Sequence, residues 1–302
     1  MKRNDAFMLV LILCIALLAN ILTAGQKHHG HRYSSSTVKS DLVTSCDDYR
    51  ITIDDQQPLL GEEEVTVPKS AATPLRVDAP ENGGISASGW NGSGYLVKAC
   101  KAAVRSGGVT AEETLRQIRL HVDGGRVSVT GPDREGWVAH IIIRTPAGAA
   151  IDLTSHNGPI GVNGVSGTIA ARTVNGPLAL KNVSGDVRGE TQNGPLDFTG
   201  SRGTLRLVAQ NGPLNVTLTG TRWEEGALDA STQNGPLSLS LSANYQSGVR
   251  VDASEHSPIS CHAIQCRQAA RTWERPSRIE FGGATPLVRL STVNGPVSID
   301  AN

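Results

Sequence analysis

Four carboxylates in the C-terminal half have the residue type that hydrolysis of a sugar polymer requires: Asp186, Glu190, Asp197 and Asp229. Cleavage of a glycosidic bond needs an acid and a base or nucleophile within several ångströms of each other. These four are scattered over the pattern described below, which predicts solvated surface carboxylates. The chain also lacks a Gly-x-Ser-x-Gly nucleophile turn and a His-Glu-x-x-His zinc helix. We therefore predict that the protein is not an enzyme, and a carbohydrate-active enzyme is the less favoured alternative.

Cysteines are the second group of residues with possible chemistry. Beyond Cys14, which lies in an N-terminal apolar run, the chain has Cys46, Cys100, Cys261 and Cys266. In an oxidising compartment four cysteines allow three connectivities, and the sequence leaves them open. Cys261 and Cys266 are near enough to close one local loop, although Cys261 also suits a small buried apolar position. A zinc site would need more ligands than His262, so we expect no metal and no cofactor.

Three arginines are candidates for contact with an acidic glycan. Arg172, Arg188 and Arg206 fall on one broad face of the pattern. A solubilising row of charges paired with Glu190 explains them equally simply, and we favour that interpretation. Lys and Arg total 28, as do Asp and Glu, so the net charge is zero. A balanced chain has no electrostatic basis for binding nucleic acid or an anionic membrane surface.

The first 25 residues have the pattern of a secretory signal. Lys2 and Arg3 precede an apolar run over residues 6–22, and small residues follow at 23–25. The export machinery recognises this order of charge, hydrophobicity and small residues. A retained membrane anchor is the alternative, since the run is close to the length that spans a bilayer. Residues 26–70 are polar, with His28, His29 and His31, and are expected to be a flexible linker.

Residues 71–150 are expected to form an N-terminal cap with the first coils. Leu75 and Val77 alternate with polar residues before the turn Asn82-Gly83-Gly84. Thr110 and Glu113 fit a capping box, which predicts one short helix from about residue 111.

Residues 151–302 are dominated by a repeat. The tripeptide Asn-Gly-Pro begins at Asn157, Asn175, Asn193, Asn211, Asn234 and Asn294. The first four copies are 18 residues apart, and a degenerate copy begins at His256. The repeat predicts stacked coils, with asparagines bonding one another along a corner. Glycine would supply a positive backbone angle at that corner.

Apolar residues recur at fixed positions of the repeat. The residues three after each Asn are Ile160, Leu178, Leu196, Leu214, Leu237 and Val297. The residues five after are Val162, Leu180, Phe198, Val216, Leu239 and Ile299. This alternation predicts the inward side of one short strand, and a second strand begins six residues before each Asn. The strand at Val249 is displaced by one residue relative to His256, which predicts a β-bulge.

Residues 261–285 have no repeat register. They include Cys266, Trp273 and Pro276 and separate the last copy of the repeat from the rest. An insertion of this length is either a lateral decoration or a functional loop, so it is the best candidate for a binding loop.

The segments 75–90, 117–129 and 183–194, together with the Asn-Gly-Pro-Leu copies, resemble a bacterial family of exported proteins described as putative adhesins or domains of unknown function. The resemblance covers about residues 75–302. It implies an all-β, single-stranded β-solenoid, or β-helix, of right hand with coils of about 18 residues. That family more often has Asn-Gly-Gly at the corner, and the resemblance carries no catalytic residues.

The sequence thus predicts a signal or anchor over 1–25, a linker over 26–70 and an adhesin-like solenoid over 71–302. The expected function is non-catalytic binding of an envelope or extracellular protein or polysaccharide. A structural scaffold without a discrete ligand is the alternative. The expected location is the periplasm, the cell surface or the medium, with membrane contact only through an uncleaved N-terminal segment.

Overall fold

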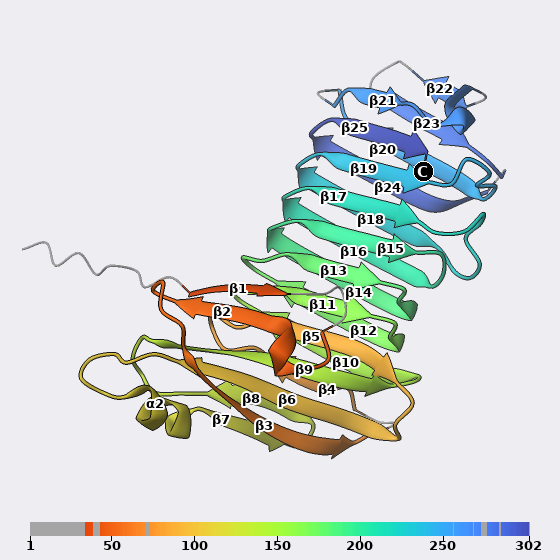
Figure 1. The fold of residues 1–302 in the computed structure, drawn as a ribbon. Coiled ribbons are helices and arrows are strands. Elements are labelled where there is room, and N and C mark those ends of the chain that lie inside the picture. Colours follow the sequence, from red (N-terminus) through yellow and green to blue (C-terminus); the bar gives the residue numbers. More distant parts are fainter. Residues whose placement is uncertain are drawn as a thin grey trace, which may run out of the picture. The chain divides into compact units, whose positions relative to one another are not determined.

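The computed structural model describes residues 34–38, 43–70, 73–255, 257–267, 269–272, 277–283 and 285–301. The predicted signal segment, the N-terminal histidines, His256, Trp273 and Pro276 lie outside the described residues. Within them, nearly all strands belong to two large sheets (Figure 1). The core lies between these two sheets and consists mainly of Val, Leu, Ile and Ala side chains.

The first large sheet has twelve strands among the described residues. In order across the sheet they are β22 (Ala270–Thr272), β23 (Ser277–Phe281), β20 (Gly248–Ala253), β24 (Pro286–Asn294), β18 (Leu228–Asn234), β16 (Thr204–Asn211), β14 (Ser184–Asn193), β12 (Ser166–Thr173), β10 (Ala149–Ser155), β4 (Leu75–Asp78), β8 (Arg126–Thr130) and β7 (Arg119–Asp123).

The second large sheet has eleven strands in the same part of the chain. In order they are β21 (Ile259–Cys261), β25 (Val297–Ala301), β19 (Leu237–Leu241), β17 (Leu214–Leu218), β15 (Leu196–Gly200), β13 (Leu178–Lys181), β11 (Ile160–Asn163), β5 (Ile85–Trp90), β9 (Trp137–Pro146), β6 (Gly94–Ala103) and β3 (Leu59–Pro68). A separate antiparallel pair consists of β1 (Ser34–Val38) and β2 (Tyr49–Ile53).

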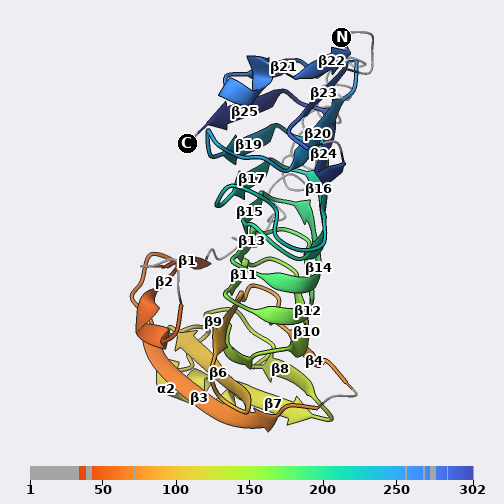
Figure 2. The ribbon, with the colours of Figure 1, turned by 90° about the vertical axis from the view of Figure 1, so that its right-hand side faces the viewer.

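Each Asn-Gly-Pro repeat contributes one strand to each large sheet (Figure 2). In the second repeat, β12 precedes the corner and pairs in parallel with β14, while β13 follows it and pairs in parallel with β15. The predicted inward columns are buried: Leu178, Leu196 and Leu214 are each 0% exposed. Two strands of four to ten residues suffice because alternate side chains point into one shared core.

The predicted single-stranded β-solenoid is wrong. The structure has two mixed sheets that are mostly parallel, and they do not close into one continuous coil. Antiparallel pairs enter at both ends, through β3, β6 and β9 at one end and through β20, β23 and β22 at the other. The repeat could not predict this, because these strands return on themselves and carry no 18-residue period.

The last repeat is inserted out of sequence order. β24 and β25 pair with β18 and β19 on one side and with β20 and β21 on the other, all in parallel (Figure 1). The repeat around residue 256 therefore lies outside the repeat of Asn294. The predicted bulge is confirmed, since the register between β20 and β24 shifts between Gly248 and Val249.

Part of the predicted linker is folded. β3 pairs with β6 over ten residues, and η1 (Cys46–Asp48) is bonded to β6 through the Cys46–Cys100 disulfide. Three consecutive glutamates of this segment, residues 62–64, lie on an edge strand, where Lys98 bonds Glu62 and Glu64 at 3.4 and 3.2 Å. Charged residues suit an edge strand because they discourage pairing with another chain.

The predicted short helix is confirmed as α2 (Ala111–Gln117). The Thr110 hydroxyl accepts from the Glu113 amide at 3.2 Å, and the Glu113 carboxylate accepts from the Thr110 amide at 3.1 Å. A second short helical turn, η2 (Ile264–Arg267), lies in the C-terminal insertion. In the described part of the chain, no helix combines the length and the apolar character needed to cross a bilayer.

Candidate functional site

The asparagines of the repeat form one row at the corner between the two sheets. Each side-chain amide donates to the side-chain oxygen of the asparagine in the neighbouring repeat. The donor–acceptor pairs are Asn175–Asn157 at 2.8 Å, Asn193–Asn175 at 2.9 Å, Asn211–Asn193 at 3.0 Å, Asn234–Asn211 at 2.9 Å and Asn294–Asn234 at 2.9 Å. Asn157 donates in turn to Asn82 at 3.4 Å, so the row begins in the first part of the fold. The row therefore links each repeat to its neighbour by a side-chain hydrogen bond.

Most corner glycines are required for a different reason from the one expected. Gly158, Gly176 and Gly194 do not have a positive backbone angle. A Cβ at Gly176 would lie 2.3 Å from the carbonyl oxygen of Gly158, and one at Gly194 would lie 2.3 Å from that of Gly176. Glycine is therefore needed because the backbones of neighbouring repeats approach each other closely.

A buried hydroxyl two residues before the asparagine was not predicted. In most repeats it donates to the carbonyl of a corner glycine in the preceding repeat. The pairs are Ser155–Gly83, Thr173–Gly158, Thr191–Gly176, Thr232–Gly212 and Thr292–Gly235, at 2.9 to 3.2 Å. The recurrence of Ser or Thr at this position was the signal in the sequence. Ala209 is the exception, and it leaves the Gly194 carbonyl without this donor.

We expect Ala209→Thr to stabilise the protein by about 1 kcal/mol, because it adds the missing hydrogen bond to a buried carbonyl. Thr191→Ala, which removes the same bond one repeat away, should cost about 1 kcal/mol or more. Urea unfolding of the two variants beside the parent measures both changes. A destabilised Ala209→Thr chain would show that the hydroxyl does not fit at this repeat.

The three arginines predicted on one face lie on the outward side of the twelve-stranded sheet. Arg172 pairs with Asp152 at 3.2 Å and with Glu190 at 3.6 Å, and Arg188 bonds Glu190 at 2.8 Å. Arg206 is exposed and has no ion pair among the described residues. Two of the three therefore belong to the paired charge row that the sequence favoured, and one does not.

The structure does not bring the candidate carboxylates together. Asp186 points outward from the twelve-stranded sheet, whereas Asp197 points outward from the eleven-stranded sheet and accepts from Asn215 Nδ2 at 2.7 Å. The core separates them, so they cannot act as an acid and base on one bond. In the described part of the chain, no group of three or more His, Cys, Asp and Glu residues could hold a metal ion.

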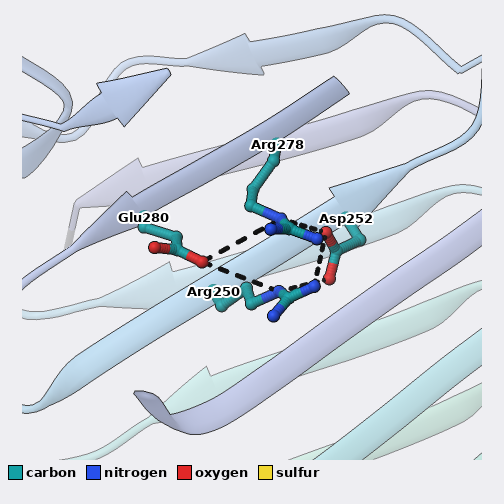
Figure 3. Close-up of polar contacts among 4 residues, drawn as sticks. All are labelled: Arg250, Asp252, Arg278 and Glu280. Carbon is teal, nitrogen blue, oxygen red and sulfur yellow. Dashed lines mark hydrogen bonds and ion pairs between the residues drawn. The ribbon is translucent and has the colours of Figure 1, made fainter. Parts of the chain in front are cut away.

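Four charged residues form a network on β20 and β23 (Figure 3). Asp252 bonds Arg250 and Arg278, each at 2.7 Å, and Glu280 lies 3.7 and 3.9 Å from the same two guanidinium groups. The hydrogen bond to Asp252 raises the pKa of Arg250. Two arginines face two carboxylates, so the network is neutral. It joins β23, the antiparallel strand of the insertion, to β20.

A hollow of about 450 Å³ lies behind the insertion that the sequence singled out. Tyr245, Gln265, Glu280 and Phe281 are among its lining residues. Gln265 Oε1 is buried without a hydrogen-bond partner in the described structure, and the Tyr245 hydroxyl is buried beside the Ser247 side chain. Burial raises the pKa of Tyr245 to about 12, so the hydroxyl remains protonated. Cys261 and Cys266 form a disulfide at the start of this insertion.

Ser260, His262 and Asp300 form a hydrogen-bonded chain that the sequence did not predict. Ser260 Oγ lies 3.1 Å from His262 Nε2, and His262 Nδ1 lies 3.0 Å from Asp300 Oδ1. This is the connectivity of a nucleophile, base and orienting acid. The side chains of His262 and Asp300 are 69% and 51% exposed, however. A working relay needs a site that is sheltered from water and has donors for the oxyanion. These side chains are not sheltered, so the three residues form a row of hydrogen bonds on the surface.

No protein-family model matches the chain, and no curated protein matches it. Several solved structures are similar over most of their length. A putative cell adhesion protein from Clostridium sporogenes is 10% identical, with 81% of this chain and 100% of that chain covered and a TM-score of 0.31. A putative adhesin from Bacteroides fragilis is 12% identical, with 81% and 97% covered and a TM-score of 0.37.

A third structure has a different name. A putative lipid binding protein from Parabacteroides distasonis is 10% identical, with 80% and 96% covered and a TM-score of 0.28. These identities and TM-scores do not assign the chain to a family or give it a function.

Proposed function

We propose that this chain is an exported, non-catalytic binding protein that contacts a protein or a glycan at the cell envelope or outside the cell. The observation that carries the proposal is the outward face of the twelve-stranded sheet, where polar side chains recur in register. One row consists of Arg188, Arg206, Asp229, Arg289 and Arg250, one residue per strand. Neighbouring members are separated by the strand spacing of about 4.8 Å.

Such a row suits a repeating or extended partner. The strands that carry these side chains are held by a core of buried aliphatic residues, so their backbone needs little ordering on binding. Arg206 and Arg289 are exposed and have no ion pair in the described part of the chain. Their guanidinium groups are available to carboxylate or sulfate groups of a partner.

Export is supported by the cysteines. Cys46–Cys100 and Cys261–Cys266 are both disulfides, which persist in oxidising compartments and are rare in the cytosol. The N-terminal pattern of charge followed by an apolar run supports the same location.

Protease treatment of intact producing cells, followed by detection of residues 150–302, tests the location. Digestion without lysis is expected if the protein acts at the cell surface. Protection until the envelope is opened would favour a periplasmic location, and protection with no partner in the next experiment would leave the scaffold as the better explanation.

The binding activity is tested by measuring how much of the protein binds to immobilised matrix proteins and polysaccharides. The release of sugar products is measured in the same samples. We expect saturable binding without turnover, weakened at least about tenfold by Arg206→Glu with Arg289→Glu. Thr217→Glu is the control for placement, because it adds a negative charge to the outward side of the other sheet. Equal loss in the control, or release of sugar products, would contradict the proposal.

A further inference from the structure

Ser88 and Arg144 have unpartnered polar atoms on one face of the β5–β9 pair, and the next residue, Thr145, has a third on the opposite face. The described residues have six buried side-chain nitrogen or oxygen atoms without a hydrogen-bond partner, and Ser88 Oγ, Arg144 Nε and Thr145 Oγ1 are three of them. Ser88 and Arg144 are directly paired in the register of the two strands. Ser88 is 2% exposed and Thr145 is 0% exposed. Buried groups of this kind are rare in folded proteins. The three atoms themselves are enclosed, so a ligand would meet Arg144 through the part of its side chain that lines the hollow.

A hollow of about 500 Å³ adjoins these residues. It is formed by the ends of β5 and β9 and by the turn between β11 and β12. Its lining residues are Gly89, Trp90, Asn91, Arg144, Thr145, Ala147, Gly164 and Ser166. The volume is in the range of small-ligand sites.

The charge in this hollow is positive and unbalanced. Arg144 has no ion pair in the described part of the chain, and no acidic side chain lines the hollow. Lys69 lies at its rim, where its Nζ donates to the carbonyl of Ala147 at 2.7 Å. A partly buried guanidinium without an anion is costly, and a carboxylate is an anion whose planar geometry it fits with two parallel hydrogen bonds.

The other lining residues suit a sugar ring. The Trp90 indole is held in place because its Nε1 donates to the Gly94 carbonyl at 2.9 Å. A fixed aromatic ring offers an apolar face against which the C–H side of a sugar can pack. The Asn91 amide and the Ser166 hydroxyl supply hydrogen-bonding groups around it.

We infer that the hollow beside Arg144 and Trp90 binds a carboxylate-bearing sugar residue. The inference rests on the proposed binding function and names a ligand class for it, at a site distinct from the arginine row of the twelve-stranded sheet. Arg144 binds the carboxylate, and Trp90 packs against the ring.

Isothermal titration of the purified full chain with glucuronate, glucose and sulfate tests the inference. Glucuronate is expected to bind with a dissociation constant on the order of 1 mM, typical for a ligand of this size. Glucose and sulfate should each bind at least about tenfold more weakly, because each offers only half of the required chemistry. Equal binding of sulfate would overturn the assignment to a sugar, and equal binding of glucose would overturn the role of Arg144.

Arg144→Gln should weaken glucuronate binding at least about tenfold while leaving the melting temperature unchanged or raised, because it removes an unpaired charge. Arg126→Gln is the matched control, since Arg126 is an exposed arginine paired with Asp78. A lowered melting temperature with unchanged binding would show that Arg144 is structural and would overturn the inference. Glucuronate binding by a chain that protease treatment places inside the envelope would contradict surface adhesion and leave this site standing. Binding at the cell surface without glucuronate binding would support surface adhesion and contradict this site.

Discussion

Replacing Gly194 with alanine is expected to destabilise the protein by about 3 kcal/mol or more. The new Cβ would lie 2.3 Å from the carbonyl oxygen and 2.7 Å from the carbonyl carbon of Gly176, distances that real Cβ atoms do not show. Both atoms are backbone, so neither can move away without disturbing the strands on either side of the corner. Urea unfolding followed by circular dichroism measures the loss.

Gly161→Ala is the matched control for this substitution. Gly161 lies in β11 of the same stack, has no positive backbone angle and would place its Cβ more than 4 Å from any other atom. Its stability should stay within about 0.5 kcal/mol of the parent or rise slightly. If Gly194→Ala lost no more than Gly161→Ala, the repeats would be separable enough to admit a side chain at the corner.

The corner shows how far the repeat alone predicts structure. The spacing of Asn157, Asn175 and Asn193 predicted the stacking, and the apolar columns predicted which side chains are buried. The reason for glycine was wrong, because a sequence pattern does not distinguish a positive backbone angle from close backbone approach. Both demand the same residue.

Strand order was beyond the reach of the sequence. The repeat of Asn294 follows the insertion along the chain but pairs directly with the repeat of Asn234. Spacing gives only the order along the chain, whereas pairing is decided by which edges meet in space. The sequence contained one indication of this arrangement: the copy that begins at Asn294 is a full Asn-Gly-Pro, whereas the copy at 256 is degenerate.

The prediction of a linker in the N-terminal part was wrong for a different reason. Residues 59–68 contain three consecutive glutamates and fall within the polar segment that was predicted to be a linker. They form an edge strand whose glutamates bond lysines of β6, and those lysines lie more than 30 residues away. Composition describes a segment by itself and cannot show such partners. The Arg144 hollow was missed likewise, because it joins residues from three separate segments.

His140 makes the stability of the fold dependent on pH. Its ring is buried, stacks on Tyr49 at 4.6 Å between centroids, and accepts from the Gly84 amide through Nδ1 at 3.0 Å. Burial lowers the pKa of His140 from 6.5 to about 4. The acceptor role of Nδ1 also requires the neutral ring, because a protonated Nδ1 could not receive this bond.

Between pH 6.5 and about 4, the unfolded chain therefore binds a proton at His140, whereas the folded chain does not. The free energy of unfolding contributed by this group is complete above pH 6.5 and decreases as the pH falls, by about 3 kcal/mol when pH 4 is reached. Burial raises the pKa of Tyr49 to about 12, so the stacked tyrosine stays neutral throughout this window.

His140→Gln should remove this part of the pH dependence, because glutamine keeps a carbonyl acceptor and does not titrate. Urea unfolding of parent and variant at several pH values between 7 and about 4 measures the difference, and taking the difference cancels the carboxylates, which titrate in both chains. His121→Gln is the control for the substitution itself, because His121 is exposed and its side chain bonds Thr130 at 2.7 Å on the surface. If the free energy of unfolding changed with pH equally in the parent and in His140→Gln, β2 would open at a small cost in free energy. The imidazolium would then be solvated without global unfolding.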